Sequence, residues 1–182
     1  MKGCKNYFAA IVMLTLLFGC GKYDDGPLLS LRSKNSRIEG KWKAVGFNYE
    51  YKNSGAPEEN ESYSLDGTTM THQYNDFSFD PFTGELIVDP ITDTYNYELT
   101  YEFDTKNNEF NSSETSDNTV QTNQGYWSWQ DGASSHEMIE IDGQQYLIKK
   151  LTNKELVLYL DYAESYDGYN YTSFMELKFE KE

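Results

Sequence analysis

Histidine and serine, the residues that most often carry hydrolytic or metal chemistry, offer little in this sequence. The chain of 182 residues has two histidines, His72 and His136. The second ends the run Ser134–His136, whereas the members of a Ser-His-Asp triad converge from separate segments. A Gly-x-Ser-x-Gly elbow, a phosphate-binding Gly-x-x-x-x-Gly-Lys loop and a His-Glu-x-x-His zinc motif are all absent from the sequence. We therefore expect neither a hydrolytic enzyme nor a zinc site.

Acidic residues are plentiful and could hold calcium or form a carboxylate pair. Asp76–Glu85 and Asp89–Asp93 contain the oxygen ligands that Ca²⁺ prefers, but neither segment has EF-hand spacing. We interpret both as turn-rich acidic loops and expect no metal or other cofactor. Paired carboxylates also hydrolyse glycosides, so an enzyme that acts on glycans is the weakest of three functional hypotheses.

Aromatic residues are the one clear excess, with 16 Tyr, 10 Phe and 3 Trp. Tyrosine and tryptophan combine an apolar face with a polar tip, which suits ligand pockets and sugar-stacking surfaces. Strands favour the same residues for packing. Trp127 and Trp129, in the segment GYWSW, share one side of an expected strand, where they either line a cavity or close one.

The elements that position these side chains follow a period of two. Alternation places on common faces Tyr95, Tyr97, Leu99, Tyr101 and Phe103; Val45, Phe47, Tyr49 and Tyr51; Leu156, Leu158, Leu160 and Tyr162; and Met175, Leu177 and Phe179. Such alternation is typical of antiparallel strands with one buried face. We expect Tyr97, Leu99 and Tyr101 to share the interior with Phe47 and Tyr49.

Turn signals separate these segments. Asp66-Gly67, Asp142-Gly143 and Asp167-Gly168 are pairs that favour two-residue hairpins. Residues 52–62 are predicted to form a long polar loop, and no amphipathic helix is evident after residue 37. About 8–10 strands joined in this way predict an all-β fold, an antiparallel up-and-down barrel or a sandwich.

The segment Ile38–Phe47 contains Gly40-Lys41-Trp42 and resembles the Gly-x-Trp opening of lipocalins. The order of segments from GYWSW to LYLDY resembles the C-terminal half of lipocalin-like lipoproteins of the bacteroidete type. The resemblance spans residues 37–182 and implies an up-and-down barrel in which Trp42 closes one end; the alternative is a plain core tryptophan. A Thr-Asp-Tyr turn and a late arginine are missing, since Arg37 is the last arginine. The resemblance therefore implies neither a Trp–Arg closure nor a ligand.

The N-terminal residues have the pattern of a secretory signal. Lys2 and Lys5 precede the apolar run Phe8–Phe18. As a helix this run spans only about 16 Å of the roughly 30 Å of a bilayer core. The segment Leu17–Cys20 resembles a bacterial lipobox, which implies cleavage before Cys20, acylation of Cys20 and a membrane anchor made of its acyl chains.

Cleavage divides the chain into a signal peptide, residues 1–19, a lipidated tether, 20–36, and a barrel domain, 37–182. The barrel domain contains no cysteine, which excludes disulfides within it. Asp24 and Asp25 resemble the acidic export signal of bacteroidete-type lipoproteins; an ordinary polar tether is the alternative. We expect an outer-membrane lipoprotein, at the cell surface or facing the periplasm.

The acidic excess of the sequence limits the classes of partner that the protein can bind. The chain has 30 acidic and 15 basic residues, and this balance excludes nucleic acid and disfavours adsorption to anionic lipid. Our leading hypothesis is a barrel that binds a small, partly apolar ligand or a glycan; its rival is a structural or protein-interaction module with a filled barrel. The candidate ligand-binding residues are Phe47, Tyr49, Tyr97, Tyr101, Trp127 and Trp129.

Overall fold

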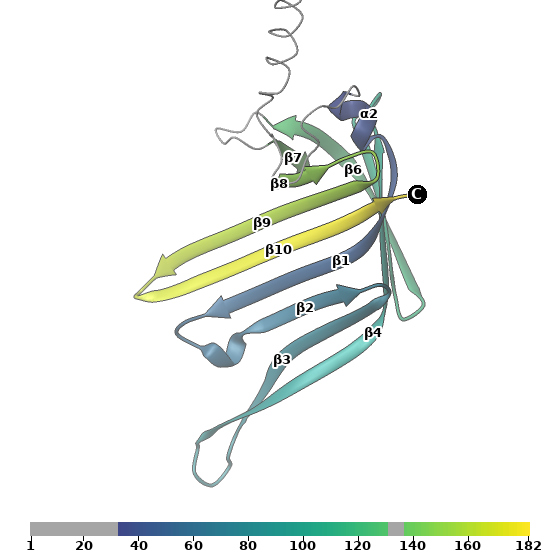
Figure 1. Ribbon diagram of the computed structural model, residues 1–182. Helices are drawn as coiled ribbons and strands as arrows, with labels where there is room; N and C mark the ends of the chain where they lie inside the picture. The colour runs from purple at the N-terminus through teal and green to yellow at the C-terminus, as the bar shows by residue number, and fades with distance from the viewer. Residues whose placement is uncertain (1–32, 131–136) are drawn as a thin grey trace, which may run out of the picture.

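The computed structural model describes residues 33–130 and 137–182, most of which lie in β-strands (Figure 1). One short helix, α2, precedes the first strand, and a 3₁₀ turn, η1, follows it. The elements are α2 Lys34–Ile38, β1 Gly40–Asn53, η1 Pro57–Glu59, β2 Glu61–Asp66, β3 Thr69–Phe79, β4 Leu86–Asp104, β5 Glu109–Ser116, β6 Thr119–Gln130, β7 Met138–Ile141, β8 Gln144–Leu151, β9 Glu155–Tyr166 and β10 Tyr169–Lys181.

The ten strands form a closed antiparallel barrel. Each strand pairs with its neighbours in sequence, and β1 also pairs with β10, which closes the sheet. This is up-and-down order, so the predicted all-β barrel is confirmed, at the upper end of the predicted strand number. Hairpins suffice for these connections because antiparallel neighbours need no crossover.

The predicted Asp-Gly turns are confirmed at β7–β8 and β9–β10. β2 and β3 also form a hairpin, but its two turn residues are Gly67 and Thr68, because Asp66 still pairs with Thr69 in the strands. Asp142 and Gly143 have φ of 50° and 82°, and Asp167 and Gly168 have 50° and 85°. A type I′ turn needs positive φ at both central positions. Aspartate tolerates that region and glycine adopts it freely, which explains why this residue pair recurs.

The barrel has two structurally different parts, which we call the closed end and the open sheet. At the closed end, residues 40–43 of β1 pair directly with residues 100–103 of β4, so the β2–β3 hairpin is left out of the ring. Farther along, residues 86–96 of β4 pair with β3, and residues 161–166 of β9 pair with β10, with no partner on their other side among the described strands. There the strands β9-β10-β1-β2-β3-β4 extend away from α2 as an open sheet (Figure 1).

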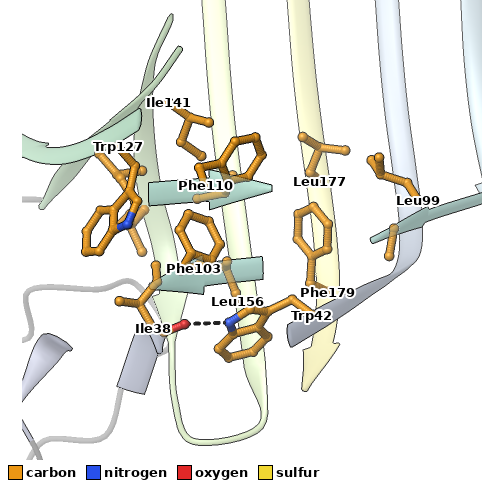
Figure 2. Close-up of a cluster of buried hydrophobic side chains, with 14 of the residues drawn as sticks. Ile38, Trp42, Leu99, Phe103, Phe110, Trp127, Ile141, Leu156, Leu177 and Phe179 are labelled. Carbon is orange, nitrogen blue, oxygen red and sulfur yellow. Dashed lines mark hydrogen bonds between the residues drawn. The ribbon is translucent and has the colours of Figure 1, made fainter. Parts of the chain in front are cut away.

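The hydrophobic core lies mainly at the closed end (Figure 2). Trp42 is fully buried, and its Nε1 donates a hydrogen bond to the Ile38 carbonyl at 2.7 Å. Around it pack aromatic and aliphatic side chains from both sides of the barrel, including Phe103, Phe110, Trp127, Leu156 and Phe179. Burial of side chains of this size is the main favourable term for folding.

Helix α2 lies against the closed end. Ser33 caps it, because its side chain accepts a hydrogen bond from the Ser36 amide at 3.2 Å. Arg37 and Ile38 are buried, and Arg37 Nη1 donates to the Leu151 carbonyl at 2.9 Å. The helix begins within the segment that we expected to be tether. Among the described residues, no helix is long and apolar enough to cross a membrane.

The structure corrects one face assignment. The alternation pattern grouped Val45 with Phe47 and Tyr49, but Val45 is 39% exposed. Pairing with β10 shifts between Ala44 and Gly46, so β1 has a bulge there. One extra residue reverses the alternation, which is why Trp42 and Ala44 are buried before the bulge and Phe47 lies on the inner side after it.

Two predicted loops are also partly wrong. β1 continues to Asn53 and β2 begins at Glu61, so only residues 54–60 connect them. The segment Asp89–Asp93 lies wholly within β4, and of Asp76–Glu85 only residues 80–85 form a turn. Charged residues and proline are common on exposed strand edges, which gave these strands a loop-like composition.

Candidate binding face

The inner side of the open sheet is lined by tyrosines. It continues from the core: Tyr63 lies two residues from buried Leu65 and pairs across the strands with Tyr49 and His72. We call this surface the tyrosine face. Its tyrosines are Tyr49, Tyr51, Tyr63, Tyr74, Tyr95, Tyr97, Tyr162, Tyr166, Tyr169 and Tyr171, on the same side as the core by strand alternation.

Burial decreases along this surface away from the closed end. Leu65 and Met70 are buried, and Tyr63, Tyr95 and Tyr97 pack against the core while staying partly exposed. Tyr162, at the far end of β9, is 54% exposed. The inner side is therefore filled at one end and open at the other.

Four rings form a continuous row across β1, β2 and β3. The rings of Tyr49 and Tyr63 lie 5.8 Å apart and tilted, and those of Tyr63 and His72 stack at 3.9 Å. His72 in turn stacks with Tyr74 at 4.5 Å. Cross-strand pairing and strand alternation together place these rings side by side.

Carboxylates accompany the rings on the same side. Tyr74 donates a hydrogen bond to Asp93 at 3.1 Å, and Glu61 Oε2 lies 3.5 Å from His72 Nε2. Tyr162 donates to Glu164. Each of these carboxylates therefore contacts a phenol or an imidazole.

The phenols of this face are held in their neutral form. Burial, and then nearby Glu61, raises the pKa of Tyr49 and Tyr63. The hydrogen bond to Asp93 is the main cause of the raised pKa of Tyr74. Burial, and then Glu114, raises the pKa of Tyr97. At neutral pH these hydroxyls are therefore hydrogen-bond donors, and the negative charge of the face comes from its carboxylates.

Lysines lie on the outer side of the same strands. Lys43 pairs with Glu98 at 3.1 Å, and Lys149 and Lys178 reach Glu176 at 2.9 and 3.1 Å. Among the described residues of β9, β10, β1, β2, β3 and β4, Lys181 is the one base at an inner position, and it lies at the closed end, near Trp42. The two sides thus differ in their contacts. Glu98 and Glu176 on the outer side have lysine partners, whereas Glu61, Asp93 and Glu164 on the inner side have aromatic partners.

A depression of about 420 Å³ lies on the other side of the same strands. Most of its lining falls at outer positions of β1 to β4, among them Lys52, Ser62 and Gln73. Glu50, which forms an ion pair with Lys52, also lines it. This hollow is therefore separate from the row of rings.

Four of the six predicted ligand-binding residues lie along the inner wall. Phe47, Tyr97 and Tyr101 pack against the core, and Tyr49 lies farther out in the row of rings. Tyr101 contacts Phe110 edge-on at 4.8 Å. Tyr97, Tyr101 and Leu99 share the interior side with Phe47 and Tyr49, as the alternation predicted.

The two remaining candidates lie at the closed end. Trp127 is 3% exposed, packs edge-on against Phe103 at 5.6 Å and donates to the Asp104 carbonyl. Trp129 donates to Asn35 Oδ1 at 2.6 Å, and Lys34 Nζ lies 4.5 Å from its ring. These contacts with the core and α2 favour a packing role for both tryptophans.

Gly40 and Trp42, the lipocalin-like motif, also belong to the closed end. Gly40 has φ of 102°, which favours glycine. Lys181, in the last strand, places Nζ 5.0 Å from the Trp42 ring and donates to the Arg37 carbonyl at 2.9 Å. A lysine thus lies over the tryptophan although the chain lacks a late arginine, a pairing that the sequence pattern did not predict.

Several predicted residues lie outside the described residues, namely Cys20, Asp24, Asp25 and the run Ser134–His136. Conversely, sequence reasoning missed Tyr63, His72 and Tyr74. Their alternation with Leu65 and Met70 is visible in ESYSL and MTHQY, but only strand pairing shows that they meet.

Metal binding and relationships to known proteins give no further assignment. Within residues 33–130 and 137–182, no group of three or more histidine, cysteine, aspartate or glutamate side chains is arranged to hold a metal ion. Comparison with protein-family models, curated proteins and solved structures finds no match.

Proposed function

We propose that this protein is a lipid-anchored binding protein rather than an enzyme, and that its tyrosine face binds a small, partly apolar ligand. The observation that carries the proposal is the change in burial along the inner wall. Half-buried tyrosines continue from the packed core into the open sheet. Large amphipathic rings with polar neighbours are typical of ligand sites.

The row of rings is the proposed centre of this site. Tyr49, Tyr63, His72 and Tyr74 already contact one another, so little ordering of side chains is needed on binding.

The test is titration with the neutral apolar dye N-phenyl-naphthylamine, followed by fluorescence. We expect wild-type protein to bind the dye, and Tyr49→Ala and Tyr74→Ala each to weaken binding by about fivefold. Tyr126→Ala is the matched control, because Tyr126 is 73% exposed on β6 and belongs to no part of the tyrosine face. A folded wild-type protein that binds no dye would overturn the proposal.

A protein-interaction module is the second candidate, and the tip of the β3–β4 hairpin favours it. Phe79 is 67% exposed and Phe82 96% exposed. Phe77 and Phe79 pair with Val88 and Leu86, so four apolar side chains share one side of the hairpin. If this tip joins two copies of the chain, Phe79→Ser with Phe82→Ser should convert dimers to monomers in sedimentation, without changing dye binding.

Anchoring is proposed from the lipobox-like segment Leu17–Cys20. Cys20→Ser should release the protein from the membrane fraction and leave an uncut precursor. Membrane retention of this variant would contradict the anchor.

Export to the cell surface is proposed separately, from the acidic residues Asp24 and Asp25. Replacing both with alanine should reduce access of external protease while lipidation continues. Unchanged access would show that these residues are only part of a tether, and an outer-membrane lipoprotein facing the periplasm would then be the better account.

A further inference from the structure

The distribution of charge within the barrel wall points to the charge of the ligand. This inference rests on the proposed binding function and asks which chemistry the tyrosine face selects. Glu61, Asp93, Glu114 and Glu164 occupy inner positions, opposite Tyr51, His72, Leu99 and Tyr171 respectively. Beyond the closed end, where Lys181 lies near Trp42, the described residues of these strands place no lysine or arginine on that side.

Overall acidity does not explain this arrangement. The outer side is also rich in carboxylates, but there lysines neutralise several of them, as in Lys41–Glu182 at 2.6 Å and Lys43–Glu98 at 3.1 Å. On the inner side the corresponding contacts are made by Tyr74, Tyr162 and His72. A phenol shares a hydrogen bond with a carboxylate but leaves its negative charge uncompensated.

Aromatic rings and carboxylates together favour cations. The face of a tyrosine ring attracts an ammonium group through its quadrupole, and more strongly when water is partly excluded. A carboxylate beside the ring adds a direct attraction, which is stronger near a protein surface than in bulk water. The same rings supply apolar contact for the body of the ligand.

We propose that the ligand of the tyrosine face is a small organic cation, an ammonium group carried on an apolar body. The ammonium group lies near Glu61 and Asp93, which border the row of rings from Tyr49 to Tyr74. The apolar body lies along the half-buried wall towards the core. Anionic ligands of the same shape are rejected, because the open part of this face presents carboxylates and no base.

The test compares three compounds that share one skeleton: phenylpropylammonium, phenylpropanol and phenylpropionate. Each is titrated by calorimetry into wild-type protein at low and at physiological salt. We expect the ammonium compound to bind about tenfold tighter than the alcohol, and the carboxylate compound to bind weakest. The advantage of the ammonium compound should shrink as salt rises, because salt screens exposed charges.

Variants locate the effect on the face. The double variant Glu61→Gln, Asp93→Asn should bring the ammonium compound close to the alcohol in affinity, with little change for the alcohol itself. The control is Glu102→Gln with Glu180→Gln, which changes net charge equally on the outer side. It should leave the tenfold preference in place; loss of the preference in this control would show that net charge alone attracts the cation.

The outcomes separate the two proposals. If the alcohol binds as tightly as the ammonium compound, the cation inference fails and the binding function survives. If none of the three compounds binds to folded protein, the binding function fails with it. Tighter binding of the carboxylate compound would also overturn the cation inference.

Discussion

The closed end and the open sheet share strands but use aromatic residues differently. All three tryptophans, Trp42, Trp127 and Trp129, lie at the closed end, where their ring N–H groups donate to Ile38, Asp104 and Asn35. The open sheet instead exposes tyrosines beside carboxylates. At the closed end every indole N–H donates to an acceptor within the protein, whereas in the open sheet the tyrosine hydroxyls stay near solvent. The packed core thus lies at one end of the barrel, and the face that we propose to bind ligand lies at the other.

The largest expected effect comes from truncation at the closed end. Phe103 is 1% exposed and contacts Phe110 and Trp127, so Phe103→Ala should lower the free energy of unfolding by about 3–5 kcal/mol. Tyr74→Ala, in the open sheet, should cost less than about 1 kcal/mol. Urea unfolding measures both, and equal losses would break the distinction between the two regions.

Alkaline unfolding should follow from the tyrosines. Burial raises the pKa of Tyr95, Tyr97, Tyr101 and Tyr146 above the ordinary value of 10.0. The unfolded chain loses these protons first, so stability is intact below pH 10 and falls as pH rises above it. Urea unfolding across this range, with phenolate absorbance recorded, measures the effect. A stability that stays constant through this range would contradict it.

A smaller effect is expected at Lys181. Lys181→Met removes the cation near Trp42 and the hydrogen bond to the Arg37 carbonyl, which should cost about 1–2 kcal/mol. Lys178→Met is the control, because Lys178 makes an exposed ion pair with Glu176, worth about 0–1 kcal/mol. Equal costs, measured by thermal unfolding, would show that Lys181 does not support the closed end.

Much of the fold could be predicted because its signals are local. Period-two alternation and Asp-Gly turns predicted the up-and-down barrel, and Tyr49 and Tyr97 fell on the expected side. The bulge after Ala44, which turned Val45 outward, has no comparable local signal. The direct pairing of residues 40–43 with β4 depends on which strands are long enough to meet. That contact separates the closed end from the open sheet, so the division could not be predicted.

The candidate site was harder to predict for the same reason. Trp127 and Trp129 share a face, as expected, but that face points into the core and towards α2. Tyr63, His72 and Tyr74 come together only through the register of β1, β2 and β3. The lysine near Trp42 comes from the opposite end of the chain. Long-range pairing decided each of these positions.

The central claim is that the closed end packs the core while the tyrosine face binds the ligand. Its most direct test is a nuclear magnetic resonance titration with phenylpropylammonium. The three tryptophan indole N–H signals report on the closed end, and the backbone amides of Tyr49, Tyr63 and Tyr74 report on the tyrosine face. We predict that these amides shift progressively as ligand is added, while the three indole signals stay in place. Shifts concentrated in the indole signals of Trp127 and Trp129, with the tyrosine face unchanged, would contradict the account.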